Sequence, residues 1–120
     1  MKPNIRHIGS PRGDDLESVQ PDDPSNFQAT VRVMIGPDGA PGEESFDFFV
    51  CTPAWLEGEC ERKGFFLIRR FLAVSHWDAG LVRRAIENVV SSVTGDSWPE
   101  LASKLATIAY WEFEDYREAP

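Results

Sequence analysis

Alternating apolar and polar positions in the first half of the chain predict two β-strands joined as an antiparallel hairpin. Every second residue of 27–35 is apolar, which is the pattern of a strand with one buried face. Residues 45–52 repeat this alternation around Phe46 and Phe48. The connector 36–42 is rich in glycine and proline, as turns are. Two strands of matching length joined in this way favour a hairpin.

Shorter patterns on either side of the hairpin predict two more strands and a helical turn. Residues 2–9 fit a first strand, and residues 65–74 fit a third strong strand after the hairpin. Thr52 is suited to cap a short helical turn that begins at Pro53. Residues 10–26 contain several prolines and acids, which is typical of a surface loop.

Helical periodicity replaces alternation in the last third of the chain. Residues 76–93 carry an apolar stripe at helical spacing. A second helix is expected from Trp98, because Ser97 and Glu100 have the spacing of a capping box. Strands followed by helices predict an α+β fold of two layers, in which two C-terminal helices pack on one face of an antiparallel sheet of about four strands. The predicted core is made of apolar residues on the inner faces of these elements: Val31, Val33, Phe46, Phe48, Leu67, Ile86, Val89, Leu101 and Leu105.

Length and charge narrow the class of protein. The chain has 120 residues, which is room for one domain with a single core over residues 1–120. Its formal net charge is −8, with acids concentrated in residues 36–62 and 96–120. An acidic surface disfavours nucleic acid and anionic membranes and favours basic partners, although it also serves ordinary solubility. The chain shows neither a membrane-length apolar run nor a secretory signal pattern, so we expect a cytoplasmic protein.

Candidate catalytic and metal-binding residues are few. His76 and Asp78 have a spacing that would suit an oriented general base in a small enzyme. We favour the simpler interpretation, in which both residues belong to the start of a helix and Asp78 complements the helix dipole. Cys51 and Cys60 lack the spacing of a zinc site. The sequence therefore predicts no catalytic residues, no metal site and no cofactor.

The segment 111–116 alternates large aromatic side chains with carboxylates. We expect it to dock on the domain, with Trp111 and Phe113 buried and the carboxylates facing outward, because aromatic rings gain most when they leave water. Trp and Tyr are also enriched in protein interfaces. The candidate partner-binding residues are acids and aromatics of three segments: Glu43, Glu44, Asp47, Trp55, Glu57, Glu59, Glu112, Glu114, Asp115 and Tyr116.

Several phrases of the sequence, in order and over nearly the whole chain, resemble the immunity protein 8 family of bacterial polymorphic toxin systems. The matching phrases are Leu16-Glu17, Pro21-Asp22-Asp23-Pro24, Phe27, Ile35-Gly36-Pro37-Asp38-Gly39, Glu43-Glu44-Ser45-Phe46-Asp47-Phe48, Val50-Cys51-Thr52-Pro53, Trp55-Leu56, Gly95-Asp96-Ser97-Trp98 and Trp111-Glu112-Phe113-Glu114-Asp115-Tyr116. The strings from Val50 to Pro53 and from Trp111 to Tyr116 are the most specific of these.

This resemblance implies an α+β fold and a protein that is not an enzyme, which binds and neutralises a cognate toxin. If the toxin is a nuclease, its cleft must be basic to hold nucleic acid, and an acidic surface would compete for it. Two other functions stay open at this point: a small cytosolic enzyme that uses His76 and Asp78, and a general protein-interaction adaptor.

Overall fold

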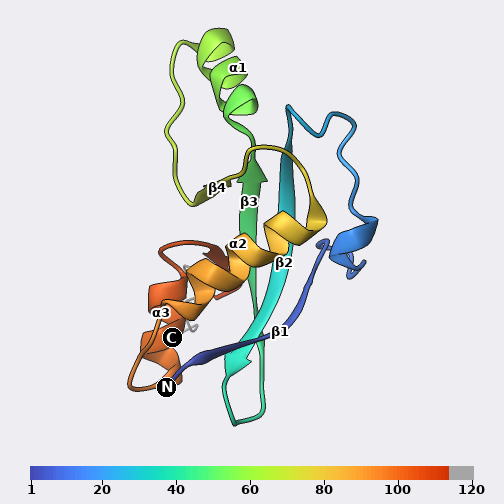
Figure 1. The fold of residues 1–120 in the computed structure, drawn as a ribbon. Coiled ribbons are helices and arrows are strands. Elements are labelled where there is room, and N and C mark those ends of the chain that lie inside the picture. Colours follow the sequence, from blue (N-terminus) through green and yellow to red (C-terminus); the bar gives the residue numbers. More distant parts are fainter. Residues whose placement is uncertain (114–120) are drawn as a thin grey trace.

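The computed structural model describes residues 1–113, which form a five-stranded sheet with helices around it (Figure 1). The strands are β1 (Pro3–Gly9), β2 (Gln28–Pro37), β3 (Glu44–Cys51), β4 (Phe71–Ala73) and β5 (Tyr110–Trp111). The helices are the 3₁₀ helix η1 (Leu16–Ser18) and the α-helices α1 (Pro53–Lys63), α2 (Ala79–Ser91) and α3 (Trp98–Leu105). The α+β class predicted from the sequence is confirmed.

The sheet is antiparallel except at one edge. β2 pairs antiparallel with β1 and with β3, and Val31 lies opposite Phe48, so the predicted hairpin is confirmed. The other edge of β3 is shared by two short strands. β5 pairs antiparallel with Phe46 and Asp47, and β4 pairs parallel with the stretch that begins at Phe49.

The turn between β2 and β3 requires glycine at one close approach of two backbones. A Cβ atom on Gly36 would lie 2.0 Å from the carbonyl oxygen of Gly42, a distance that no side chain tolerates. Arg6 of β1 ties the same turn to the sheet, because its guanidinium donates to the carbonyl oxygens of Pro37 and Ala40 at 3.0 and 2.7 Å. The turn is therefore held closely against the first strand.

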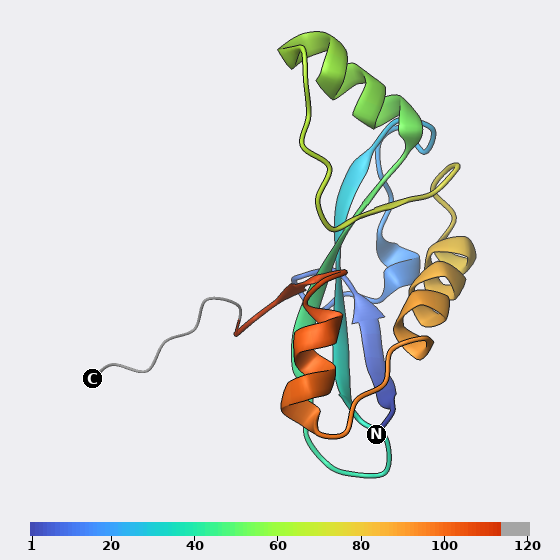
Figure 2. The ribbon, with the colours of Figure 1, turned by 90° about the vertical axis from the view of Figure 1, so that its left-hand side faces the viewer.

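The core lies between the inner face of the sheet and the two later helices. α2 crosses one face of the sheet, and α3 lies beside β3 near β5 (Figures 1 and 2). The predicted core residues that are fully buried are Val31, Val33, Phe46, Phe48, Ile86, Leu101 and Leu105. Val89 is only half-buried and packs at the margin of this core. Among residues 1–113, no helix has the length and apolar character needed to cross a bilayer.

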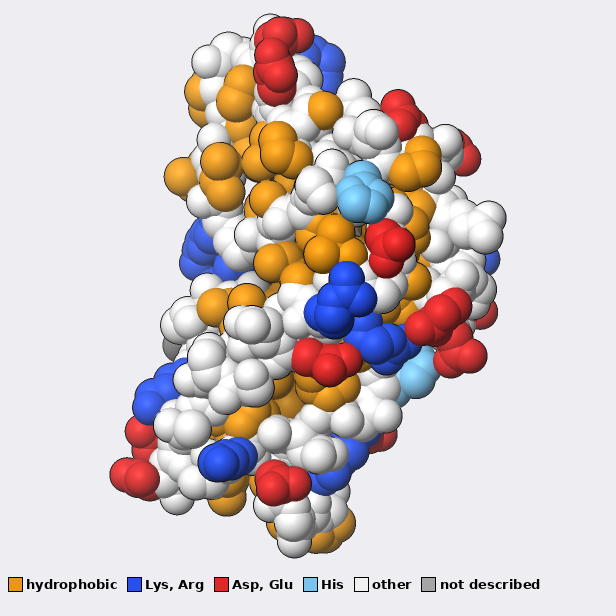
Figure 3. Space-filling view, in the orientation of Figure 1, with side chains coloured by type: hydrophobic (Ala, Val, Ile, Leu, Met, Phe, Trp, Pro, Cys, Tyr) orange, Lys and Arg blue, Asp and Glu red, His pale blue; other side chains and the backbone are white. Residues whose placement is uncertain are grey.

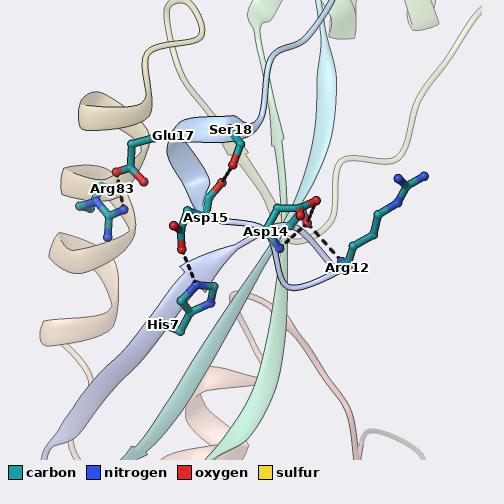
Figure 4. Close-up of polar contacts among 8 residues, drawn as sticks. His7, Arg12, Asp14, Asp15, Glu17, Ser18 and Arg83 are labelled. Carbon is teal, nitrogen blue, oxygen red and sulfur yellow. Dashed lines mark hydrogen bonds and ion pairs between the residues drawn. The ribbon is translucent and has the colours of Figure 1, made fainter.

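The segment between β1 and β2 is held to the body by one apolar anchor and two ion pairs (Figure 4). Leu16 of η1 is fully buried. His7 Nε2 lies 3.2 Å from Asp15 Oδ1, and Arg83 of α2 donates to Glu17 at 2.6 Å. The Arg83 hydrogen bond lowers the pKa of Glu17, so the ion pair favours the charged carboxylate.

The expected strand over residues 65–74 is wrong for most of its length. Only β4, three residues long, joins the sheet. The reason lies in the partner, because β5 occupies the edge of β3 at Phe46 and Asp47 and leaves β4 only the last part of that edge. Leu67, expected in the core, is 79% exposed.

α1 is longer than the short turn that the sequence suggested. Pro53 occupies its first turn after Thr52, and Gly64 ends it in the left-handed region at φ 84°, where glycine carries no steric penalty. The helix extends beyond the end of β3, away from α2 and α3 (Figure 1). Glu59 is its one buried residue. α1 and residues 64–70 together are called the projection below.

α2 begins later than the predicted start at residue 76. Asp78 is its N-cap, and its carboxylate accepts a hydrogen bond from the backbone N–H of Leu81 at 2.9 Å. This bond satisfies one of the helix's unpaired N–H groups, so the helix starts at Ala79 and leaves His76 outside it.

Candidate protein-interaction surface

Glu44, the first residue of β3, is held by two tryptophans. The indole N–H of Trp98 donates to one carboxylate oxygen at 3.0 Å, and the indole N–H of Trp111 donates to the other at 2.6 Å. Phe46 lies beside both rings, stacked on Trp111 and edge-on to Trp98. Glu44 therefore fastens α3 and β5 to the sheet, and its carboxylate faces the protein instead of a partner.

The next residues of the C-terminal segment continue the pairing of β5. The backbone N–H of Glu112 donates to the carbonyl oxygen of Ser45 at 3.1 Å, and the Glu112 carboxylate accepts from the backbone N–H of Ser45. Trp111 is half-buried, but Phe113 is 40% exposed and contacts the Trp111 ring. The expectation that Phe113 is largely buried is thus wrong, because the strand ends before it reaches the core. Of the candidate residues, Glu114, Asp115 and Tyr116 lie outside the described residues.

Asp47 is paired on the outer face of the sheet. Arg32 of β2 donates to its two carboxylate oxygens at 2.8 and 3.0 Å. This two-point contact raises the pKa of Arg32 and occupies both oxygens of the acid. Paired in this way, Asp47 contributes little field to attract a partner.

The acids of α1 differ among themselves. Glu59 is buried against the helix and pairs with Lys63 at 2.9 Å and with Arg62. The hydrogen bond from Lys63, followed by that from Arg62, lowers the pKa of Glu59. Glu57 and Glu43 are exposed, and neither forms an ion pair within the described part of the chain. They lie beyond opposite ends of β3, so the structure does not bring them into one patch.

Trp55 belongs to an aromatic cluster that joins the projection to the sheet. Its ring lies 5.5 Å from that of Phe66 and 5.8 Å from that of Phe71, between ring centroids. Phe71 contacts Phe49 of β3, and Phe49 contacts Tyr110 of β5 at 4.7 Å. Trp55 thus has a structural role, because it positions the root of the projection.

Arg70 sits where the projection returns to the sheet. Its φ is 58°, in the left-handed region, which is uncommon for residues other than glycine. Its guanidinium lies over the ring of Tyr110, 4.7 Å from the centroid, a distance at which the cation and the ring attract each other. This contact holds the bend that leads into β4.

Beyond this root, the projection exposes large apolar side chains. Phe65, Leu67 and Ile68 are 75%, 79% and 59% exposed. Figure 3 shows hydrophobic side chains gathered at the upper left of the molecule, where Figure 1 places the segment between α1 and β4. Neighbouring apolar side chains exposed to this degree mark interaction sites in soluble proteins. The sequence offered this surface only as an apolar run, and a buried strand produces the same run.

Comparison with known families decides the class of protein. The sequence profile described as immunity protein 8 matches residues 4–116. The chain belongs to the immunity protein 8 family. This confirms the resemblance found in the sequence and makes the chain an immunity protein, whose partner is a toxin. Searches of curated proteins and of solved structures found no match.

The remaining chemistry of this immunity protein gives no support to a catalytic role. His76 is exposed and its Nδ1 lies 2.9 Å from Ser75 Oγ, whereas Asp78 caps α2. Within residues 1–113, no three His, Cys, Asp or Glu residues are grouped so that they could hold a metal ion. Cys51 is buried and burial raises the pKa of its thiol, whereas Cys60 is exposed; both are free thiols. A non-enzymatic role agrees with membership in a family of immunity proteins.

Proposed function

We propose that this immunity protein neutralises its toxin by direct binding, and that the projection makes the central contact. The observation that carries this proposal is the exposure of Phe65, Leu67 and Ile68 on one short segment. Burying a single Leu or Phe side chain stabilises a complex by roughly 1.5–3 kcal/mol. Interfaces concentrate their binding energy in a few such anchors.

Exposed acids supply the second part of the proposed interaction. The net charge of −8 and the exposed carboxylates of Glu43 and Glu57 would draw a basic toxin surface toward the protein, mainly by raising the association rate. A nuclease fits this description, because it needs a basic cleft to hold nucleic acid. In this proposal the pair belongs to a bacterial polymorphic toxin system, and the complex forms in the cytoplasm.

The test is co-expression with the toxin domain encoded beside the gene of this chain, followed by binding measurements on the purified pair. Leu67→Ser should weaken binding by about tenfold or more, because it removes an apolar side chain worth roughly 1.5–3 kcal/mol on burial. Leu67→Met is the matched control, since it keeps the apolar area and should keep the affinity. Both variants should melt like the parent, because Leu67 is 79% exposed.

The contribution of charge is measured separately. Glu57→Lys should slow association, with little change in dissociation, and the difference should shrink as salt is added. If Leu67→Ser protects cells and binds the toxin as well as Leu67→Met does, the projection is not the contact.

A further inference from the structure

The projection leaves a stretch of backbone unpaired. Residues 65–69, called the unpaired segment below, form no backbone hydrogen bond with any other part of the chain within residues 1–113. The last such bond before them runs from Gly64 to Cys60, and pairing with β3 resumes only at Phe71. Most backbone N–H and C=O groups in folded proteins have a protein partner, so five unpaired residues in succession are unusual.

Side-chain exposure along the unpaired segment alternates as in a strand. Phe65 and Leu67 are 75% and 79% exposed, whereas Phe66 between them is half-buried and contacts the rings of Trp55 and Phe71. Alternation of this kind is the mark of an extended chain with two faces. The aromatic contacts of Phe66 therefore fix one face and turn the other toward solvent.

We infer that the toxin adds a β-strand to the unpaired segment. An extended chain with unpaired polar groups and apolar, strand-forming side chains is a template for another strand. Main-chain hydrogen bonds would supply affinity, and Phe65 and Leu67 would enter apolar pockets on the toxin. This inference rests on the proposed function, because it specifies how the same surface holds the toxin.

Charge favours a toxin strand over a second copy of this chain. The unpaired segment is flanked by cations, Lys63 on one side and Arg69 with Arg70 on the other. Antiparallel pairing of two copies about the centre between Phe66 and Leu67 would set Lys63 opposite Arg70, and parallel pairing in register would set each Arg69 beside its copy. Like charges placed opposite each other destabilise a strand pair. The complementary partner is an apolar strand with carboxylates at its ends.

Hydrogen exchange on the complex with the neighbouring toxin domain tests this inference directly. In the free protein the amides of the unpaired segment should exchange rapidly. In the complex, alternate amides of the segment should exchange about tenfold more slowly or less, because a partner strand bonds every second N–H on one edge. A complex in which these amides stay unprotected would overturn the strand addition while leaving toxin binding intact.

Proline substitution separates backbone pairing from side-chain contact. Neighbouring N–H groups of an extended chain point to opposite edges, so either Leu67→Pro or Ile68→Pro removes a donor to the toxin. One of the two should bind about tenfold more weakly than the alanine variant at the same position. The melting temperature should be similar for all four variants, since no internal backbone bond is lost.

The remaining outcomes are also decisive. Equal affinity of each proline variant and its alanine counterpart would contradict the inference. Sedimentation of the free protein as a dimer with protected amides in the unpaired segment would assign the segment to a second copy instead. Absence of any complex would refute the proposed function and this inference together.

Discussion

The contact of Glu44 with two indoles makes a quantitative prediction about stability. Glu44→Gln keeps the size of the side chain and one acceptor oxygen, but it places an amide NH₂ where the second oxygen was. Because Trp98 and Trp111 donate to different oxygens, one indole must lose its acceptor and face a donor instead. Glu44→Ala removes both acceptors at once.

The size of the effect follows from the environment of the two rings. A hydrogen bond to a charged group contributes about 1.5–3 kcal/mol, and an unsatisfied buried donor costs about 1–3 kcal/mol. Both indoles are half-buried, so water replaces part of the loss. We therefore expect Glu44→Gln to lower the free energy of unfolding by about 1–2 kcal/mol and Glu44→Ala by about 2–4 kcal/mol. For a chain of this size, 1 kcal/mol corresponds to a shift of about 3–6 °C in melting temperature.

Urea unfolding followed by far-ultraviolet circular dichroism measures these free energies. Trp111→Phe removes the second indole donor but keeps a ring stacked on Phe46. In that background Glu44→Gln should cost less than in the parent, and the difference is the coupling between the two residues. Glu43→Gln is the matched control, because Glu43 is exposed and should change stability by about 0.5 kcal/mol or less. If Glu44→Gln is as stable as Glu43→Gln, the indole contacts do not hold the fold.

Three further predictions follow from other contacts. Glu59→Gln should lower the melting temperature at about pH 7 and progressively less toward about pH 3. The hydrogen bond from Lys63 lowers the folded pKa of Glu59, so its stabilisation is present above the unfolded value of about 4.3 and is lost as the pH falls through the folded one; equal differences at both pH values would contradict this. Ile86→Ala should cost about 2–5 kcal/mol by urea unfolding, because Ile86 is fully buried and its removal leaves a cavity; an unchanged midpoint would remove it from the core. Cys60 should react with a thiol reagent in the native protein and Cys51 only in urea, because Cys51 is buried with a raised thiol pKa; labelling of both in the native state would show that the base of α1 opens.

Elements that bury one face were predictable from the sequence. The hairpin of β2 and β3 alternates because each strand has one side against the core, and α2 carries an apolar stripe for the same reason. The capping box before α3 was also readable, since Ser97 accepts from the backbone N–H of Glu100 at 3.3 Å. Local rules suffice where the chain packs against its own core.

The projection was not predictable by the same rules. α1 has no core face to record in its sequence, because it extends away from the sheet with Glu59 as its one buried residue. The apolar residues after it follow the pattern of a buried strand, yet Leu67 is exposed. Periodicity shows that a face is apolar but not whether the chain itself or another molecule covers it.

The role of Glu44 was hidden for a different reason. As a sequence it is one of two adjacent acids before a strand, and we expected it on the partner-binding surface. Its partners are Trp98 and Trp111, which lie 54 and 67 residues away. No local pattern encodes a contact over that separation, so its role became visible only in the structure.

The sharing of the β3 edge between β4 and β5 also has a consequence for the order of folding. The pairings of β2 with β1 and β3 link segments that are near in sequence, whereas β5 must close a loop of more than sixty residues to reach Phe46. Long loops carry a greater closure entropy, so contacts of this kind form late. β5 therefore joins a sheet that is already assembled. Weakening Trp111 would then leave the refolding rate nearly unchanged and accelerate unfolding, which makes this short strand a determinant of how long the native state lasts.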